Sequence, residues 1–127
     1  MISTSKAKEI LNQLCKDFNV PSLKLIHLRY TNIRVKGEYY QDLIAIYGNI
    51  TMECLLHEFA HHVHEYRTKN HKQSHNLSFF RICFEIRDYF QQKHGVSIYN
   101  ISGYNQMTSY KKALTEWLDS KANCQYN

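Results

Sequence analysis

The sequence predicts an α+β fold in which a small sheet of about three strands is backed by an N-terminal helix and followed by three further helices. Helical periodicity dominates residues 3–18 and most of the chain after residue 50, whereas the stretch between them alternates apolar and polar residues. The chain has 127 residues, of which 43% are hydrophobic. That length suits one ordinary domain and is too short for two well-cored ones, so we expect a single domain over residues 1–127.

The elements before residue 50 are predicted to be one helix and three short strands. Apolar residues recur at helical spacing from Ser3 to Phe18, and Pro21 stops the helix. Three stretches then alternate in the manner of strands, at residues 22–30, 33–36 and 42–47. Gly37 is predicted to turn the chain toward the third of them. If residues 42–47 form the edge of the sheet, a substrate peptide could pair with them as an added strand.

Helices are predicted to fill most of the chain after residue 50. The first runs from Ile50 to about Lys69, with an apolar stripe made of Met52, Leu55, Leu56, Phe59, Ala60, Val63 and Tyr66. The second covers residues 76–93 and is ended by Gly95. Residues 96–106 are predicted to be irregular or a short hairpin, and a last helix, capped by Thr108 or Ser109, extends to Lys121.

The helix predicted from Ile50 to about Lys69 carries a His-Glu-x-x-His motif on the side opposite its apolar stripe. His57 and His61 are four residues apart, so on a helix both imidazoles project from one face, about 6 Å apart, toward a single ion. Glu58 lies about 100° around the helix, outside the ligand set but beside any water that the metal holds. This pattern predicts catalytic zinc, with Glu58 as the general base for an attacking water.

A catalytic zinc needs a third protein ligand and an open fourth position. A histidine six residues after His61 is ruled out, because position 67 is Arg. His75 is the favoured ligand, since it lies near the start of the next helix and continues an apolar face through Phe79 and Ile82. Glu85, on that helix, is the second choice and His71 the third.

The run from Leu55 to Phe80, LLHEFAHHVHEYRTKNHKQSHNLSFF, resembles the core of SprT-like zinc metalloproteases, the group that includes the Spartan proteases acting on DNA–protein crosslinks. The resemblance covers about residues 20–90 and implies a minimal zincin-like fold. It also implies Zn²⁺ as cofactor, a protein or peptide substrate, and possible association with DNA. His57, His61 and His75 would be the metal ligands, and Glu58 the catalytic base.

The chain departs from that group in two ways. Ser74 and Asn76 stand where glycines commonly flank the third histidine, and no cysteine-rich zinc ribbon follows. Small gluzincin-type peptidases, which use a glutamate as third ligand, are an alternative that would make Glu85 the ligand. The other classes considered are a basic nucleic-acid-binding protein with a structural metal, and a zinc-binding scaffold that has lost turnover.

Neighbouring residues carry weaker expectations. We expect His64 and Glu65 to be solvent-exposed, and His62 to be at the surface or packed against the sheet. Cys54 lies on the side of His57, so a closed structural site that includes its thiolate is a further alternative. A tyrosine could assist by donating a hydrogen bond to an oxyanion, with Tyr99, Tyr104 and Tyr110 as the candidates.

The composition restricts the expected binding partners and cellular location of the protein. The net charge of +5 permits contact with nucleic acid or acidic surfaces, but the cations are spread along the chain, as on a solvated face. Four cysteines stand far apart without a Cys-x-x-Cys pair, which favours free thiols in a reducing compartment. With no signal peptide and no apolar run that could span a membrane, the expected location is cytoplasmic.

Overall fold

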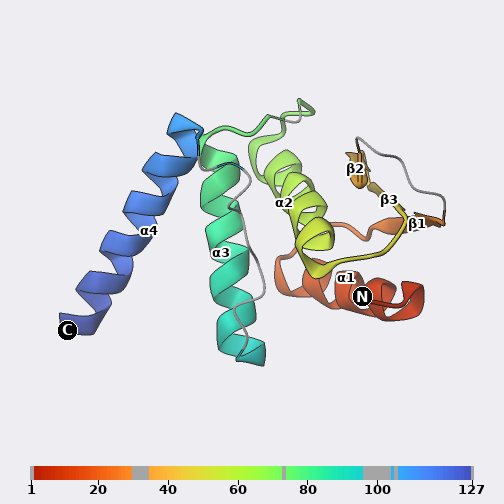
Figure 1. Ribbon diagram of the computed structural model, residues 1–127, viewed down its shortest axis with the longest axis horizontal. Helices are drawn as coiled ribbons and strands as arrows, with labels where there is room; N and C mark the ends of the chain where they lie inside the picture. The colour runs from red at the N-terminus through yellow and green to blue at the C-terminus, as the bar shows by residue number, and fades with distance from the viewer. Residues whose placement is uncertain (1, 30–34, 73, 96–103, 105, 127) are drawn as a thin grey trace. The chain divides into compact units, whose positions relative to one another are not determined.

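The computed structural model describes residues 2–29, 35–72, 74–95, 104 and 106–126. The chain divides into two compact units, Met1–Gln73 and Ser74–Asn127. The first contains α1 (Thr4–Asp17), β1 (Lys24–Leu28), β2 (Gly37–Tyr40), β3 (Leu43–Tyr47) and α2 (Met52–Thr68), and the second contains α3 (Leu77–His94) and α4 (Thr108–Tyr126) (Figure 1). The predicted α+β fold is confirmed, and the single domain stays a prediction.

Helix α1 forms where the sequence predicts it. The Ser3 hydroxyl caps the first turn by accepting a hydrogen bond from the Lys6 amide at 3.1 Å. Of the apolar residues predicted at helical spacing, Ala7, Leu11 and Leu14 are buried and Ile10 and Phe18 are half-buried. Cys15 is buried as well. The helix ends at Asp17, and Asn19 adopts a left-handed conformation with φ 54° before Pro21.

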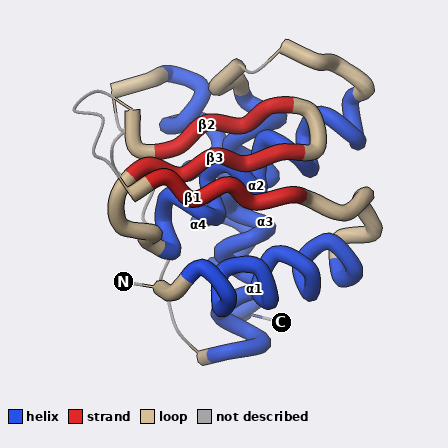
Figure 2. Tube along the Cα trace, turned by 90° about the vertical axis from the view of Figure 1, so that its right-hand side faces the viewer, coloured by secondary structure: helices blue, strands red, loops and turns tan. Residues whose placement is uncertain are grey.

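The sheet has the strand order β1-β3-β2, with β3 parallel to β1 and antiparallel to β2 (Figure 2). The predicted turn at Gly37 is wrong, because Gly37 begins β2 and pairs with Ile46. The chain reverses instead at Gln41 and Asp42, where Asp42 has a left-handed φ of 59°. The strand predicted at 33–36 has its first half outside the described residues, and Val35 and Lys36 precede β2.

The position of β3 corrects a second expectation. Because β3 pairs with a strand on each side, residues 43–47 have no free backbone edge to offer a peptide. The two edges of this sheet belong to β1 and β2. The order of elements along the chain suggests that the strand before α2 lies at the edge, whereas the parallel pairing with β1 puts it in the centre.

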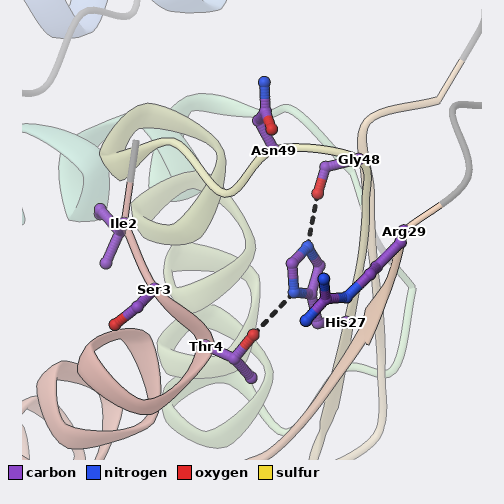
Figure 3. Close-up of a pocket in the computed structure, with 7 residues that line it drawn as sticks. All are labelled: Ile2, Ser3, Thr4, His27, Arg29, Gly48 and Asn49. Atoms are coloured by element: carbon purple, nitrogen blue, oxygen red, sulfur yellow. Dashed lines mark hydrogen bonds between the residues drawn. The ribbon is translucent and has the colours of Figure 1, made fainter.

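His27 on β1 joins three parts of the first unit. Its Nε2 donates a hydrogen bond to the Gly48 carbonyl just after β3, and its Nδ1 lies 2.7 Å from the Thr4 hydroxyl at the start of α1 (Figure 3). A cavity of about 510 Å³ adjoins this imidazole, lined by Ile2, Ser3, Thr4, His27, Arg29, Gly48 and Asn49. His27 thus fixes the start of α1 against the end of the sheet.

The second unit consists of α3 and α4, which lie side by side and run in the same direction (Figure 1). Asn76 caps α3 through its side-chain oxygen, and Gly95 ends it with φ 68°, as predicted. Arg81 and Glu116 form a two-pronged ion pair between the helices, with both N–O distances 2.8 Å. The Trp117 indole donates to Asp88 at 3.0 Å. Most of residues 96–106, predicted to be irregular, lies outside the described residues.

Helix α4 differs from prediction at both ends. It begins at Thr108 and extends past Lys121 to Tyr126. Ser109 is therefore inside the first turn, where its hydroxyl donates a hydrogen bond to the His75 carbonyl and does not cap the helix. No described helix is both long and apolar enough to cross a membrane.

Candidate metal centre

Helix α2 is buried around nearly its whole circumference. The predicted stripe is buried at Leu55, Leu56, Phe59, Ala60 and Val63, but so are five polar residues: Glu58, His61, His62, His64 and Glu65. The expectation that His64 and Glu65 are exposed is therefore wrong. A buried polar group costs free energy unless a partner satisfies it, so each of these residues must be accounted for.

Three histidines form a group that could hold a metal ion. The ligand atoms of His57, His61 and His75 all lie within 4.8 Å of one another. His57 and His61 are presented by successive turns of α2, and their ring centroids are 5.0 Å apart. His75 comes seven residues after the last residue of α2 and two residues before α3. These are the three residues predicted as ligands, and their role as zinc ligands stays a prediction.

The chemistry of this group fits zinc. Three neutral imidazoles with one open position are a common catalytic donor set. Nitrogen donors around a tetrahedral zinc lie about 3.4 Å apart, because each bond is about 2.1 Å long, and the ligand atoms of this group lie within 4.8 Å of one another. Burial lowers the pKa of His75, which favours the neutral form that binds metal.

The other ligand candidates are not members of the group. The Nδ1 atom of His71 lies 2.9 Å from the Glu65 carboxylate. Glu85 is exposed on α3, where it lines a groove with Glu116 and Trp117. Cys54 is half-buried, and burial together with the charge of Glu58 raises the pKa of its thiol to about 12. A thiol that resists deprotonation is a poor metal ligand in this setting.

Glu58 is the one buried carboxyl group on α2 that the fold does not pair. Its side chain is only 6% exposed, and no hydrogen bond or ion pair to it occurs among the described residues. Burial raises the pKa of this carboxyl from 4.5 to about 7, and the negative charge of Glu38 on β2 adds to the rise. A carboxyl group with a pKa near neutrality is suited to general acid–base chemistry.

Two other buried polar residues of α2, His62 and Glu65, have structural partners. His62 is fully buried, with Nε2 donating to the Pro21 carbonyl at 2.7 Å and Nδ1 lying 2.9 Å from the Tyr39 hydroxyl. Burial lowers the pKa of His62, which disfavours the charged form that an ion pair with Asp42, 3.9 Å away, would need. Glu65 is held by His71. These residues fix α2 to the sheet and to the turn that follows it.

Gly37 allows β2 to pass directly beside Glu58. A Cβ atom at Gly37 would lie 2.6 Å from the Cys54 sulfur and 3.5 Å from Cγ of Glu58. Only a residue without a side chain permits this close approach of strand and helix. The edge strand β2 is therefore packed against the turn of α2 that carries the candidate base.

His75 is surrounded by aromatic rings of its own unit. The centroid of its ring lies 4.7 Å from that of Tyr104 and 5.1 Å from that of Phe79. Tyr104 is one of the three tyrosines proposed as oxyanion helpers; it lies beside His75, and that role stays a prediction. Tyr110 packs on Phe80 and Phe84, and Tyr99 lies outside the described residues.

No protein-family model, no curated protein and no solved structure gives a significant match to this chain. The resemblance to SprT-like proteases therefore rests on the residues quoted for it, and it stays a prediction.

Proposed function

We propose that this protein is a zinc-dependent endopeptidase of the SprT-like type, with His57, His61 and His75 as metal ligands and Glu58 as general base. The observation that carries the proposal is the combination of two features that share the His57–His61 segment of α2. Three imidazoles could hold one ion, and the neighbouring carboxyl group is buried, unpaired among the described residues, and has a pKa of about 7. Histidines that merely fill a core would not need this carboxyl group.

Each residue has a defined task in this proposal. Zinc, when bound, supplies a Lewis acid that lowers the pKa of water toward about 7 and polarises a peptide carbonyl. Glu58, next in sequence to His57, accepts the proton of the attacking water and delivers it to the leaving amine. The burial of Glu58 strengthens its interaction with the developing charges, because it excludes water.

We further propose that the substrate lies along β2. Tyr47 donates its backbone N–H to Lys36, and strand residues alternate in the direction of their backbone groups, so Gly37 and Tyr39 direct theirs away from β3. Because Gly37 lies against Cys54 and Glu58, a peptide paired with this edge would run beside the base. A structure with a bound peptide that makes no backbone contact to residues 37–40 would contradict this placement.

The proposal is tested by measuring zinc content and casein digestion on the same preparations. Glu58→Gln should keep one zinc per chain and lose at least about 10²-fold in activity, because the proton acceptor is gone. His75→Ala should lose or weaken zinc binding. Glu53→Gln removes the same charge from an exposed position on the same helix and should change neither property.

The outcomes separate the proposed function from its rivals. Full activity in Glu58→Gln would refute the role of Glu58. Bound zinc without activity in the wild type, with or without added DNA, would instead favour a structural metal or a scaffold. Full zinc stoichiometry and affinity in His75→Ala would exclude that residue as a ligand.

A further inference from the structure

We propose that Tyr104 and Ser109, which lie about thirty residues after His75 in the chain, are positioning residues that hold His75 in the orientation required for metal binding. This inference rests on the proposed metal site. It assigns to the start of α4 a task in metal binding, although α4 contributes no ligand to the group of three histidines.

His75 needs external support because it is not in regular structure. It precedes Asn76, the capping residue of α3, so its backbone has no place in the hydrogen-bond ladder of a helix. By contrast, His57 and His61 are within α2 and are held by that helix. The third ligand of a metal site must be fixed as well as the other two, or ordering it reduces the affinity.

Ser109 supports the backbone of His75. The Ser109 hydroxyl, in the first turn of α4, donates a hydrogen bond to the His75 carbonyl at 3.2 Å. Hydrogen bonds of this kind contribute about 0.5–1.5 kcal/mol. The hydrogen bond fixes the position of the His75 backbone relative to the first turn of α4.

Tyr104 supports the imidazole ring. Its ring centroid lies 4.7 Å from that of His75, at an interplanar angle of 49°, and 5.4 Å from that of Phe80. Phe79 contacts the imidazole at 5.1 Å. Rings packed on an imidazole restrict its rotation and leave fewer orientations to be lost when a metal binds.

Tyr104 and Ser109 belong to one local structure. The backbone N–H of Met107 donates to the Tyr104 carbonyl at 3.0 Å, and the N–H of Lys111 donates to the Met107 carbonyl at 3.1 Å. These bonds join Tyr104 to the first turn of α4. The helix is in turn fixed to α3 by the pair Arg81–Glu116 and by the bond from Trp117 to Asp88.

Tyr110 provides a matched control. Its described ring contacts are with Phe80 and Phe84, so Tyr110→Leu removes an aromatic ring from the same cluster, on the same helix. Tyr104→Leu removes the ring that packs on His75, whereas Tyr104→Phe keeps that ring. Ser109→Ala is a milder change that removes only the hydroxyl.

The experiment measures Zn²⁺ affinity by competition with a chromophoric chelator, and the visible absorption of the Co²⁺-substituted protein, which reports the symmetry of the ligands. Loss of a residue that orients a metal ligand commonly reduces affinity about 10–100-fold. We expect a loss of that size and an altered Co²⁺ spectrum in Tyr104→Leu, and about a 2–10-fold loss in Ser109→Ala. Tyr104→Phe and Tyr110→Leu should resemble the wild type.

Equal affinities and spectra for Tyr104→Leu and Tyr110→Leu would overturn the role of Tyr104. If Tyr104→Leu does not fold by circular dichroism, Ser109→Ala decides, and wild-type affinity in that variant would overturn the inference. A wild-type protein that binds no zinc would refute the metal site itself and this inference with it. Zinc bound tightly by the wild type and equally by all four variants would refute only the positioning role.

Discussion

Replacing Glu58 with Gln should stabilise the metal-free protein, and the gain should depend on pH. The carboxyl group is buried, and its pKa is raised from 4.5 to about 7, chiefly by burial and secondarily by Glu38. A change of one in pKa corresponds to about 1.4 kcal/mol, so ionising Glu58 in the folded, metal-free protein costs about 3 kcal/mol. A neutral amide of the same shape avoids this cost.

The direction of the pH effect follows from proton binding. Between pH 4.5 and about 7 the folded protein holds a proton on Glu58 that the unfolded chain has released. The free energy of unfolding therefore falls as pH rises through this range, and above it the loss is complete. The stability advantage of Glu58→Gln should be smallest below pH 4.5 and grow to about 3 kcal/mol above pH 7.

The measurement is urea unfolding of both proteins in the presence of EDTA, at several values from about pH 5 to about pH 8. Burial lowers the pKa of His62, His64 and His75, so these groups destabilise both proteins in acid. Because both proteins contain them, the difference between the two curves isolates Glu58. Glu53→Gln, at an exposed position of α2, controls for loss of charge alone.

A difference that is independent of pH, or that shrinks as pH rises, would refute this reasoning. The first result would mean that Glu58 ionises in the folded protein as easily as in the unfolded chain, and the second that it ionises more easily. Either result would remove the argument that the site raises the pKa of its base.

Two further substitutions test how α2 is held against the sheet. Gly37→Ala should destabilise the protein by about 1–3 kcal/mol in urea unfolding, because its Cβ would meet the Cys54 sulfur at 2.6 Å. Adding Cys54→Ala to this variant should restore much of the lost stability. Equal losses in the single and the double variant would exclude this contact as the cause. His62→Ala should cost about 2–4 kcal/mol, since it removes the hydrogen bonds of the imidazole to the Tyr39 hydroxyl and the Pro21 carbonyl and opens a cavity. A cost no larger than that of the exposed His71→Ala would contradict the buried role.

The helices could be predicted because their signals are local. Ser3 and Asn76 cap α1 and α3 through hydrogen bonds within three residues, and Gly95 ends α3 in the left-handed conformation that glycine adopts without cost. The strand pattern was also local and located β1 and β3. The pairing of the strands could not be predicted, because the parallel contact between β1 and β3 joins residues that are not neighbours in the sequence. No periodicity encodes which strand lies in the centre of the sheet.

In the candidate site, too, the features set by one helix could be predicted, whereas those set by tertiary packing could not. The spacing of His57, Glu58 and His61 is a property of one helix, and the structure keeps it. The burial of His64 and Glu65 could not be predicted, because it depends on what packs against the polar side of α2 and not on the sequence of α2 itself. The contact of Tyr104 with His75 joins residues 29 positions apart, and ten tyrosines offered no means to choose among them.

The buried polar residues of α2 give the reason why we propose a functional role for Glu58. His62 and Glu65 are as buried as Glu58, but each has a partner that links the helix to its surroundings. Glu58 has no such partner among the described residues, and its ionisation costs about 3 kcal/mol of stability. Residues that stabilise a fold do not show this combination, whereas a base whose pKa must be near neutrality requires burial with no compensating bond. If Glu58→Gln makes the metal-free protein more stable and also abolishes peptidase activity, the two results have the same cause, which is the desolvation of one carboxyl group.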